Sequence, residues 1–232
     1  MSIFYQRSLE TFFDGDRRYS YSWDEWKYTN YFFYDDEPFR TQFDPVSFLG
    51  CRGFVIAGAE LVAVWLAPVA EPRKMLDYLD AAWVSMLEDG ICDYGVFAHE
   101  EWQGPFKGVQ RAAMLIVNDA LFDAVQDQEI RVRCGYIHQL LLHILPSAQQ
   151  KYYLGWVSLS LARLRHLHSD LPVTVDLFAP TLPLGQPCAP ETFLLHESYN
   201  AADCESFLNH HRSRIMPSNS WLRTEPLQGI VG

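Results

Sequence analysis

The chain is predicted to be mainly α-helical, and three features of its sequence support this. Apolar residues recur at three- and four-residue spacing over most of the chain after residue 44, which is the period of an amphipathic helix. Prolines, glycines and capping residues stand where these periodic segments begin and end. An apolar fraction of 49% in 232 residues is enough to bury a substantial core. We expect an antiparallel array of helices, and the sequence leaves open whether helix pairs stack like a solenoid.

The first 44 residues differ from the rest of the chain in composition. They hold 15 of its 34 aromatic residues and few aliphatic ones. Large aromatic side chains usually pack inside a protein. We expect residues 1–44 to form an aromatic, acidic N-terminal segment packed on one helical domain, which residues 45–232 form.

Two patterns compete in residues 19–34. Aromatic and polar residues alternate from Tyr19 to Trp23, which is typical of a half-buried extended segment. Ser22 and Glu25 instead fit a capping box that would begin a helix. The sequence leaves both alternatives open.

Two helices are expected first in the domain of residues 45–232. The Asp44-Pro45 pair, an N-cap followed by proline, predicts a helix that ends near Leu66. Its apolar run is interrupted by Glu60, so we expect a buried core helix and not a membrane span. A second helix starts at Glu71-Pro72, ends before Gly90 and has one apolar face, formed by Leu76, Leu79, Trp83, Met86 and Leu87.

The remaining helices follow from similar signals. Helices are expected after Pro105, over residues 128–145 and from Ser147, where Ser147 and Gln150 fit a second capping box. In this last helix Tyr152, Trp156, Leu159 and Leu164 lie on related faces. Five prolines make residues 171–190 an extended arm. A final helix, capped by Asn200, is expected over residues 201–214.

The charge of the chain bears on its partners and location. The formal net charge of −11 repels phosphate backbones and anionic membranes, so we expect neither nucleic acid nor membrane as a partner. Five scattered cysteines indicate reduced thiols. The first residues lack the pattern of a cleaved signal. These features predict a cytoplasmic protein with a basic protein partner.

The search for catalytic or metal-binding residues gives little. His138 and His143 are five residues apart and point to different sides of a helix, so no metal site and no cofactor are expected. No phosphate-binding loop, dinucleotide motif or nucleophile elbow occurs. Cys92 and His99 are the one local grouping of nucleophile and base, and with Trp102 they define an alternative, a pocket for a substrate or small ligand. The main prediction is that the chain is not an enzyme.

Aromatic and acidic residues together form the predicted contact surface. Aromatic anchors supply contact area, and carboxylates around them steer a basic partner. The competing interpretation is that these aromatics form a local core. The predicted partner-binding residues are Trp23, Asp24, Glu25, Trp26, Tyr31, Asp35, Asp36, Glu37, Glu100, Glu101 and Trp102.

An acidic, compact chain without a catalytic motif resembles, in general character, the immunity proteins that bacteria make against toxins delivered by contact-dependent systems. No motif carries this resemblance. It implies an inhibitor that neutralises a cytoplasm-acting toxin by occluding its active site, which negative charge would suit if that site is basic. The alternatives are the enzyme or small-molecule binder with a pocket near Cys92, His99 and Trp102, and a peptide-binding structural adaptor.

Overall fold

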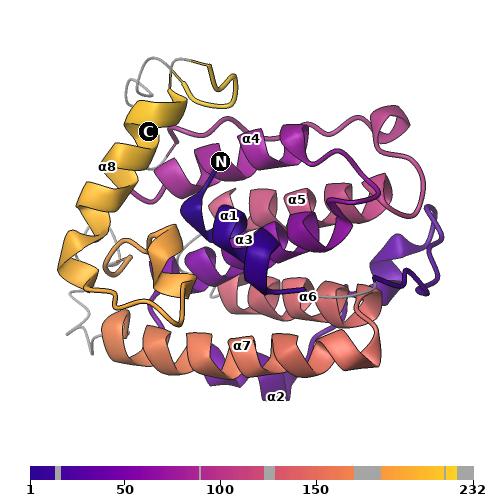
Figure 1. Ribbon diagram of the computed structural model, residues 1–232, viewed down its shortest axis with the longest axis horizontal. Coiled ribbons are helices and arrows are strands. Elements are labelled where there is room, and N and C mark those ends of the chain that lie inside the picture. Colours follow the sequence, from indigo (N-terminus) through magenta and orange to yellow (C-terminus); the bar gives the residue numbers. More distant parts are fainter. Residues whose placement is uncertain (14–16, 89, 123–128, 170–183, 217, 224–232) are drawn as a thin grey trace.

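The computed structural model describes residues 1–13, 17–88, 90–122, 129–169, 184–216 and 218–223. Within these residues the chain forms eight α-helices and no strand, which confirms the mainly α-helical prediction. Short 3-10 turns, η1 (Tyr28–Tyr31), η2 (Thr41–Phe43), η3 (His99–Glu101), η5 (Pro190–Phe193) and η6 (Ala201–Asp203), lie between them. The helices are α1 (Ile3–Thr11), α2 (Glu37–Arg40), α3 (Phe48–Leu66), α4 (Arg73–Val84), α5 (Lys107–Phe122), α6 (Glu129–Ile144), α7 (Ser147–Leu167) and α8 (Cys204–Ile215) (Figure 1).

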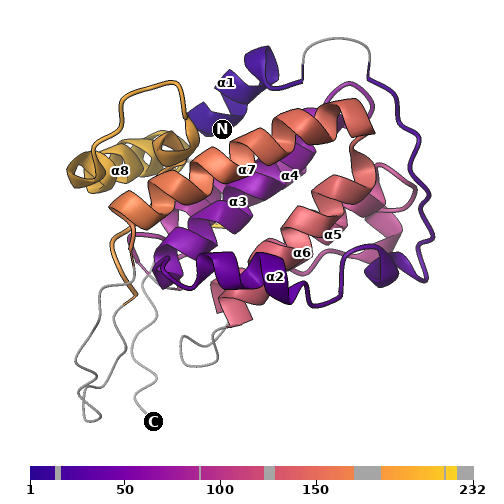
Figure 2. The ribbon, with the colours of Figure 1, turned by 90° about the horizontal axis from the view of Figure 1, so that it is seen from below.

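Helix α3 lies at the centre of the fold, and all of its residues are buried. It contacts α1, α4, α5 and α6 (Figure 2). Among the described residues it is the one helix long and apolar enough to cross a membrane, and it is wholly enclosed by the rest of the chain. In a solenoid each helix pair contacts only its neighbours in sequence. The central position of α3 is a different arrangement, with helices packed around a common core.

Two charged residues within α3 are accommodated by specific partners. The Arg52 guanidinium donates hydrogen bonds of 3.2 Å to the carbonyl oxygens of Ala120 and Leu121, at the end of α5. These carbonyls have no partner within their own helix, and a cation at a helix C-terminus is favourable. Glu60 accepts a hydrogen bond of 3.0 Å from Trp83 Nε1 on α4. Both side chains are therefore buried with a hydrogen-bonding partner.

The predicted start of this helix was wrong by three residues. Ser47, and not Asp44, is the N-cap, because its Oγ accepts a hydrogen bond of 3.2 Å from Gly50 N. The end at Leu66 is confirmed. The cap predicted at Asn200 is also confirmed, since its Oδ1 accepts from Ala202 N at 3.2 Å, although the first turn is the 3-10 turn η6.

The two predicted capping boxes do not form. Gln150 Nε2 donates to the carbonyl oxygens of Leu142 and Leu145, at 2.7 and 2.9 Å, and so closes the end of α6. Glu25 accepts a hydrogen bond from the backbone of Gly104, which lies far from it in sequence. Glu25 and Gln150 each have a partner outside their own helix start, and the spacing of a capping box does not show such partners.

The N-terminal segment shares one hydrophobic core with the rest of the chain. Residues 17–24 are extended, and their aromatic side chains are less exposed than the polar ones between them, as the alternating pattern predicted. Helices α1 and α2 were not expected. Ser2 caps α1 by accepting from Tyr5 N at 3.1 Å, and Asp36 caps α2 by accepting from Phe39 N at 3.2 Å.

The predicted arm of residues 171–190 lies mostly outside the described residues. Its described end packs against the start of α3, where Leu49 N donates to Leu184 O at 3.0 Å. Cys188 is buried beside Gly53, and a Cβ added to Gly53 would stand 2.7 Å from the Cys188 sulfur. Glycine at position 53 is therefore required for the close approach of this segment.

The buried His138 on α6 predicts a measurable loss of stability in acid. Its ring stacks on Phe39 at 3.8 Å, and its Nδ1 lies 3.0 Å from the Tyr153 hydroxyl. Burial lowers the pKa of His138 to about 4, although Asp36 favours the charged form. Between pH 6.5 and 4 the unfolded chain therefore binds a proton at this position that the folded chain does not, so the contribution of His138 to stability falls as the pH falls, by about 1.4 kcal/mol per pH unit.

Urea unfolding of the His138→Phe variant at several pH values checks this expectation. The variant keeps a ring against Phe39 but cannot take up a proton at this position. Its free energy of unfolding should fall less steeply than that of the natural chain between pH 6.5 and 4. Equal slopes would contradict the assignment.

Candidate functional site

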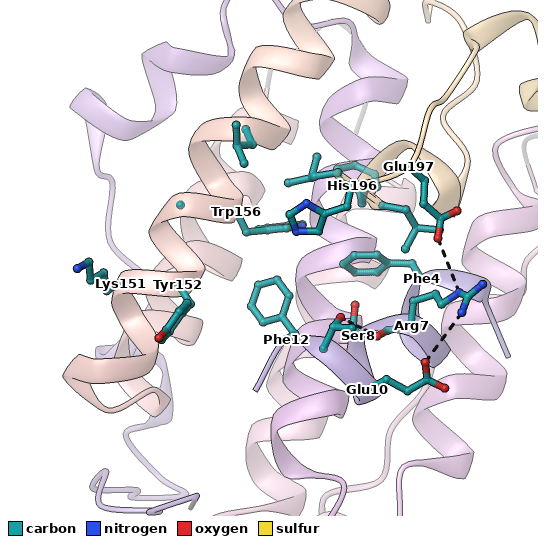
Figure 3. Close-up of a pocket in the computed structure, with 16 residues that line it drawn as sticks. Phe4, Arg7, Ser8, Glu10, Phe12, Lys151, Tyr152, Trp156, His196 and Glu197 are labelled. Carbon is teal, nitrogen blue, oxygen red and sulfur yellow. Dashed lines mark hydrogen bonds and ion pairs between the residues drawn. The ribbon is translucent and has the colours of Figure 1, made fainter. Parts of the chain in front are cut away.

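An open groove of about 560 Å³ lies between α1, α7 and residues 193–197 (Figure 3). This volume lies in the range typical of binding sites. Three nearly inaccessible rings form part of its floor, namely Phe4 from α1, Trp156 from α7 and Phe193 from η5. Their ring centroids are 5.9 to 6.0 Å apart, the separation of packed aromatic pairs. The floor is therefore a rigid, apolar surface.

The exposed side of the groove is also apolar. Tyr152 and Leu159, both on α7, are 70% and 55% exposed. Gly155 lies between them and also lines the groove. Large apolar residues on one side of a hollow are typical of a surface that binds another molecule.

Charged groups form the rim of the groove. On the α1 side, Arg7 lies 4.0 Å from Glu10 and 3.7 Å from Glu197, and Figure 3 shows this triad beside Phe4. On the α7 side, Lys151 has no ion-pair partner among the described residues. The two sides therefore differ in charge, net negative along α1 and positive along α7.

The structure brings together predicted site residues that are about 75 positions apart in sequence. Trp23, Glu25 and Trp102 line one small cavity with His99, although its volume is only about 10 Å³. The Trp26 and His99 rings are 5.6 Å apart, and His99 Nε2 lies 3.8 Å from Glu25 Oε2. Residues 23–26 and 99–102 thus form one patch of the molecular surface.

Within this patch the aromatic residues divide between core and surface. Trp102 is buried, and Trp23 packs on Tyr28 and Tyr31 with centroids 5.9 and 5.6 Å away. Tyr31 in turn stacks on His143 at 4.3 Å. Trp23, Tyr31 and Trp102 therefore pack as a local core, which is the competing interpretation of these aromatics. Trp26 differs from them, because its side chain is 86% exposed.

The predicted carboxylates have different surroundings. Asp24 caps the following turn by accepting from Trp26 N at 2.9 Å. Glu101 pairs with Lys74 at 2.9 Å, and this pairing lowers the pKa of Glu101. Glu100 is exposed in the same turn. The carboxylates at Asp24, Glu25, Glu100 and Glu101 lie on the two segments of the chain that meet where the Trp26 and His99 rings pack together.

Three further predicted residues lie in another part of the structure. Asp36 is the cap of α2, and Glu37 lies in the first turn of that helix. Asp35 pairs with Arg40 at 3.0 Å. Their contacts are those of a helix start, where negative charge is favourable. Asp36 and the Asp35–Arg40 pair thus have a role in starting α2, and the predicted partner contact at Asp35, Asp36 and Glu37 stays a prediction.

The alternative pocket near Cys92, His99 and Trp102 is not one cavity in the described residues. Asp93 and Tyr94, next to Cys92, line an open cavity of about 430 Å³, whereas His99 and Trp102 line a separate, much smaller one. A cavity of about 10 Å³ holds at most one water molecule, and Cys92 does not line it. Burial raises the pKa of the Cys92 thiol to about 12, so the sulfur is protonated and unreactive at neutral pH. No group of three or more metal-binding side chains occurs in the described part of the chain.

A buried polar cluster joins α3, α4 and α8. Asp80 Oδ1 lies 3.3 Å from His211 Nε2. Burial raises the pKa of Glu60 to about 8, and the nearby negative charge of Asp80 contributes to this, while hydrogen bonds from Ser2 and Trp83 oppose it. The cluster lies under the core and has no opening to a cavity described above, so its effect is on stability.

No family model, curated protein or solved structure matches the chain.

Sequence reasoning missed the groove. The residues of α7 that line the groove were visible as the related faces of Tyr152, Trp156 and Leu159, but the pattern did not show which of them are exposed. Because α1 was not expected, the other side of the groove could not be anticipated. The Ser2 cap and the spacing of Phe4, Ser8 and Phe12 are the signals that could have indicated that helix.

Proposed function

We propose that the chain is a protein-binding module that contacts its partner through the Trp26 surface, defined as Asp24, Glu25, Trp26, Glu100 and Glu101. The exposure of the Trp26 side chain, at 86%, carries this proposal. A tryptophan with this degree of exposure leaves a large apolar area in water. Tryptophans that become buried in an interface are among the side chains that contribute most to binding between proteins.

The carboxylates of the Trp26 surface support a basic partner. Glu25 and Glu101 have cationic or titratable neighbours in His99 and Lys74, whereas Glu100 is exposed in the same turn. With the formal net charge of −11, this arrangement would speed association with a positively charged surface and make it sensitive to salt.

The biological role we propose is that of an immunity protein. On this proposal the chain acts in the cytoplasm and binds one toxin domain, with Trp26 as the anchor and the carboxylates placed against a basic active-site cleft. The aromatic packing of Trp23 on Tyr28 and Tyr31 supports the role, because it holds the segment before and after Trp26 in a fixed position.

Trp26→Ala is expected to weaken binding of the partner by about thirtyfold, the effect of losing a hot-spot residue. The partner is first captured by crosslinking to the tagged chain in its own cells, identified by mass spectrometry and then purified. Biolayer interferometry of the purified pair gives the dissociation constant. Tyr94→Ala is the matched control, since Tyr94 is also an exposed aromatic, at 56%, and lies outside the Trp26 surface.

The charge of the surface is tested with a second pair of variants. Glu100→Lys should lower the association rate, while Glu205→Lys, which changes the net charge equally on α8, should have a much smaller effect. The Trp26 surface would be rejected as the binding site by two results together. Trp26→Ala and Tyr94→Ala would change the dissociation constant equally, and the two charge reversals would change the association rate equally.

A further inference from the structure

One stripe of residues from α7 and one from α1 line the groove. The two stripes meet at its floor, where the Trp156 ring packs on Phe4 and Phe12 with centroids 6.0 and 6.1 Å away. On α7 the stripe is Tyr152, Gly155, Trp156 and Leu159, spaced i, i+3, i+4 and i+7. On α1 the stripe is Phe4, Ser8, Thr11 and Phe12. Such spacing is that of a helix face that packs on another helix.

Gly155 leaves space in the groove on the α7 side, because it has no side chain. It lies in the middle of a helix, where glycine is less favourable than alanine. A Cβ added at this position would meet no atom within 4 Å, so no close contact within the fold requires glycine there. What the missing side chain provides is space in the groove.

The charges of the rim are complementary to a helix that has acidic residues along one flank and basic residues along the other. The α7 side presents Lys151, and the α1 side presents Glu10 and Glu197 around Arg7. An occupant with acidic residues along one flank and basic residues along the other would meet opposite charges on both sides. An alkyl chain or a flat ring would use the apolar floor alone.

We infer that the groove between α1 and α7 binds an amphipathic helix of a partner protein, with a large apolar side chain over Gly155 and an acidic flank toward Lys151. From Tyr152 to Leu159 the α7 stripe extends about 10 Å, which is two helical turns. The occupant therefore presents three or four apolar residues at i, i+3 or i+4, and i+7. This site is separate from the Trp26 surface and does not depend on it.

The test is selection of a phage-displayed library of 16-residue peptides on the full chain, with soluble forms of the selected peptides then measured by fluorescence anisotropy. We expect the selected peptides to share the helical apolar spacing and to gain helicity on binding. Gly155→Trp, which fills the groove, should weaken their binding at least about tenfold. Ser158→Trp places the same side chain at an exposed α7 position outside the groove and should leave binding unchanged.

Charge reversal gives a second measurement. Lys151→Glu should weaken the peptides with an acidic flank and strengthen the same peptides when that flank is changed to lysine. Circular dichroism melts confirm that each variant is folded.

Several results would overturn the inference. These are peptides without helical spacing, equal binding to Gly155→Trp and Ser158→Trp, or no selected peptide at all. If dodecanoate or an anilinonaphthalene dye bound the chain, no peptide did, and Gly155→Trp blocked that binding, the groove would be a site for a small amphiphile. A dimer in light scattering that Gly155→Trp abolishes would assign it to a second copy of the chain.

Discussion

Trp156→Ala is expected to lower the free energy of unfolding by about 3–5 kcal/mol, the usual cost of removing a buried tryptophan. Trp156 is 4% exposed, and its ring packs on Phe4 of α1, Phe54 of α3 and Phe193 of η5, with centroids 6.0, 5.5 and 5.9 Å away. The substitution therefore removes ring contacts to three separate elements. Urea unfolding followed by far-ultraviolet circular dichroism measures the change.

Tyr152→Ala is the matched control for this substitution. Tyr152 is an aromatic residue on the same helix, one turn earlier, and is 70% exposed. Its loss should change stability by no more than about 0.5 kcal/mol. If the two variants were equally stable, Trp156 would not hold α1 and η5 against the core, and the floor of the groove would not be rigid.

Raising the pH from 6.5 to 8 is expected to destabilise the chain through Glu60. The pKa of Glu60 is about 8 in the folded chain, above its ordinary value of 4.5, chiefly because the carboxyl is buried. Between these values the folded chain holds a proton that the unfolded chain has lost, so stability falls as the pH rises, by about 1.4 kcal/mol per pH unit. Above pH 8 this contribution is lost and the slope levels off.

The window from pH 6.5 to 8 lies above the range in which His138 has its largest effect, and comparison with a Glu60→Gln variant isolates the effect of Glu60. Below pH 6.5 the buried His138 has the opposite slope, since its pKa of about 4 makes stability rise with pH there. Asp80 and the Met1 ammonium lie close to Glu60, and Asp80 contacts both that ammonium and His211. All three groups are present in both proteins compared. Their contributions cancel when the natural chain is compared with Glu60→Gln.

Glu60→Gln should therefore lose about 2 kcal/mol less stability than the natural chain between pH 6.5 and 8. The glutamine side chain keeps an oxygen that can accept from Trp83 Nε1, so the hydrogen bond of 3.0 Å is preserved. Urea unfolding at pH 6.5, 7, 7.5 and 8 gives both curves. If the free energies of unfolding of the two proteins changed equally with pH, Glu60 would not be the cause of the pH dependence.

Most of the fold could be predicted because it follows from local periodicity. The helices now assigned as α3 to α8 each had an apolar period and a proline, glycine or capping residue near an end. The first residue of each helix was less predictable than its apolar periodicity. Ser47 displaced Asp44 as a cap, and Gln150 closes the end of α6 where a local cap was expected. A polar side chain takes the partner that tertiary packing brings nearest, and sequence spacing does not show which one that is.

The Trp26 surface could be predicted in part. The aromatic and acidic composition of residues 23–26 and 100–102 singled out both segments, and the structure places them together. Composition could not distinguish Trp26, which faces water, from Trp23 and Trp102, which pack inward. Nor could it show that Asp35 and Asp36 are used by α2. These differences depend on contacts between distant segments.

The enclosure of α3 also has a consequence during synthesis. The helices that cover it on two sides, α5 and α6, follow it in sequence, and α6 ends at Ile144. Ribosomes add about 5–20 residues per second, so translation from Leu66 to Ile144 takes roughly 4 to 16 s. For that time the nineteen apolar-rich residues of α3 lack part of their final cover, although α1 and then α4 are already synthesised. The nascent chain at this stage is a substrate for any chaperone that binds hydrophobic segments, and the order of the helices sets how long it remains one.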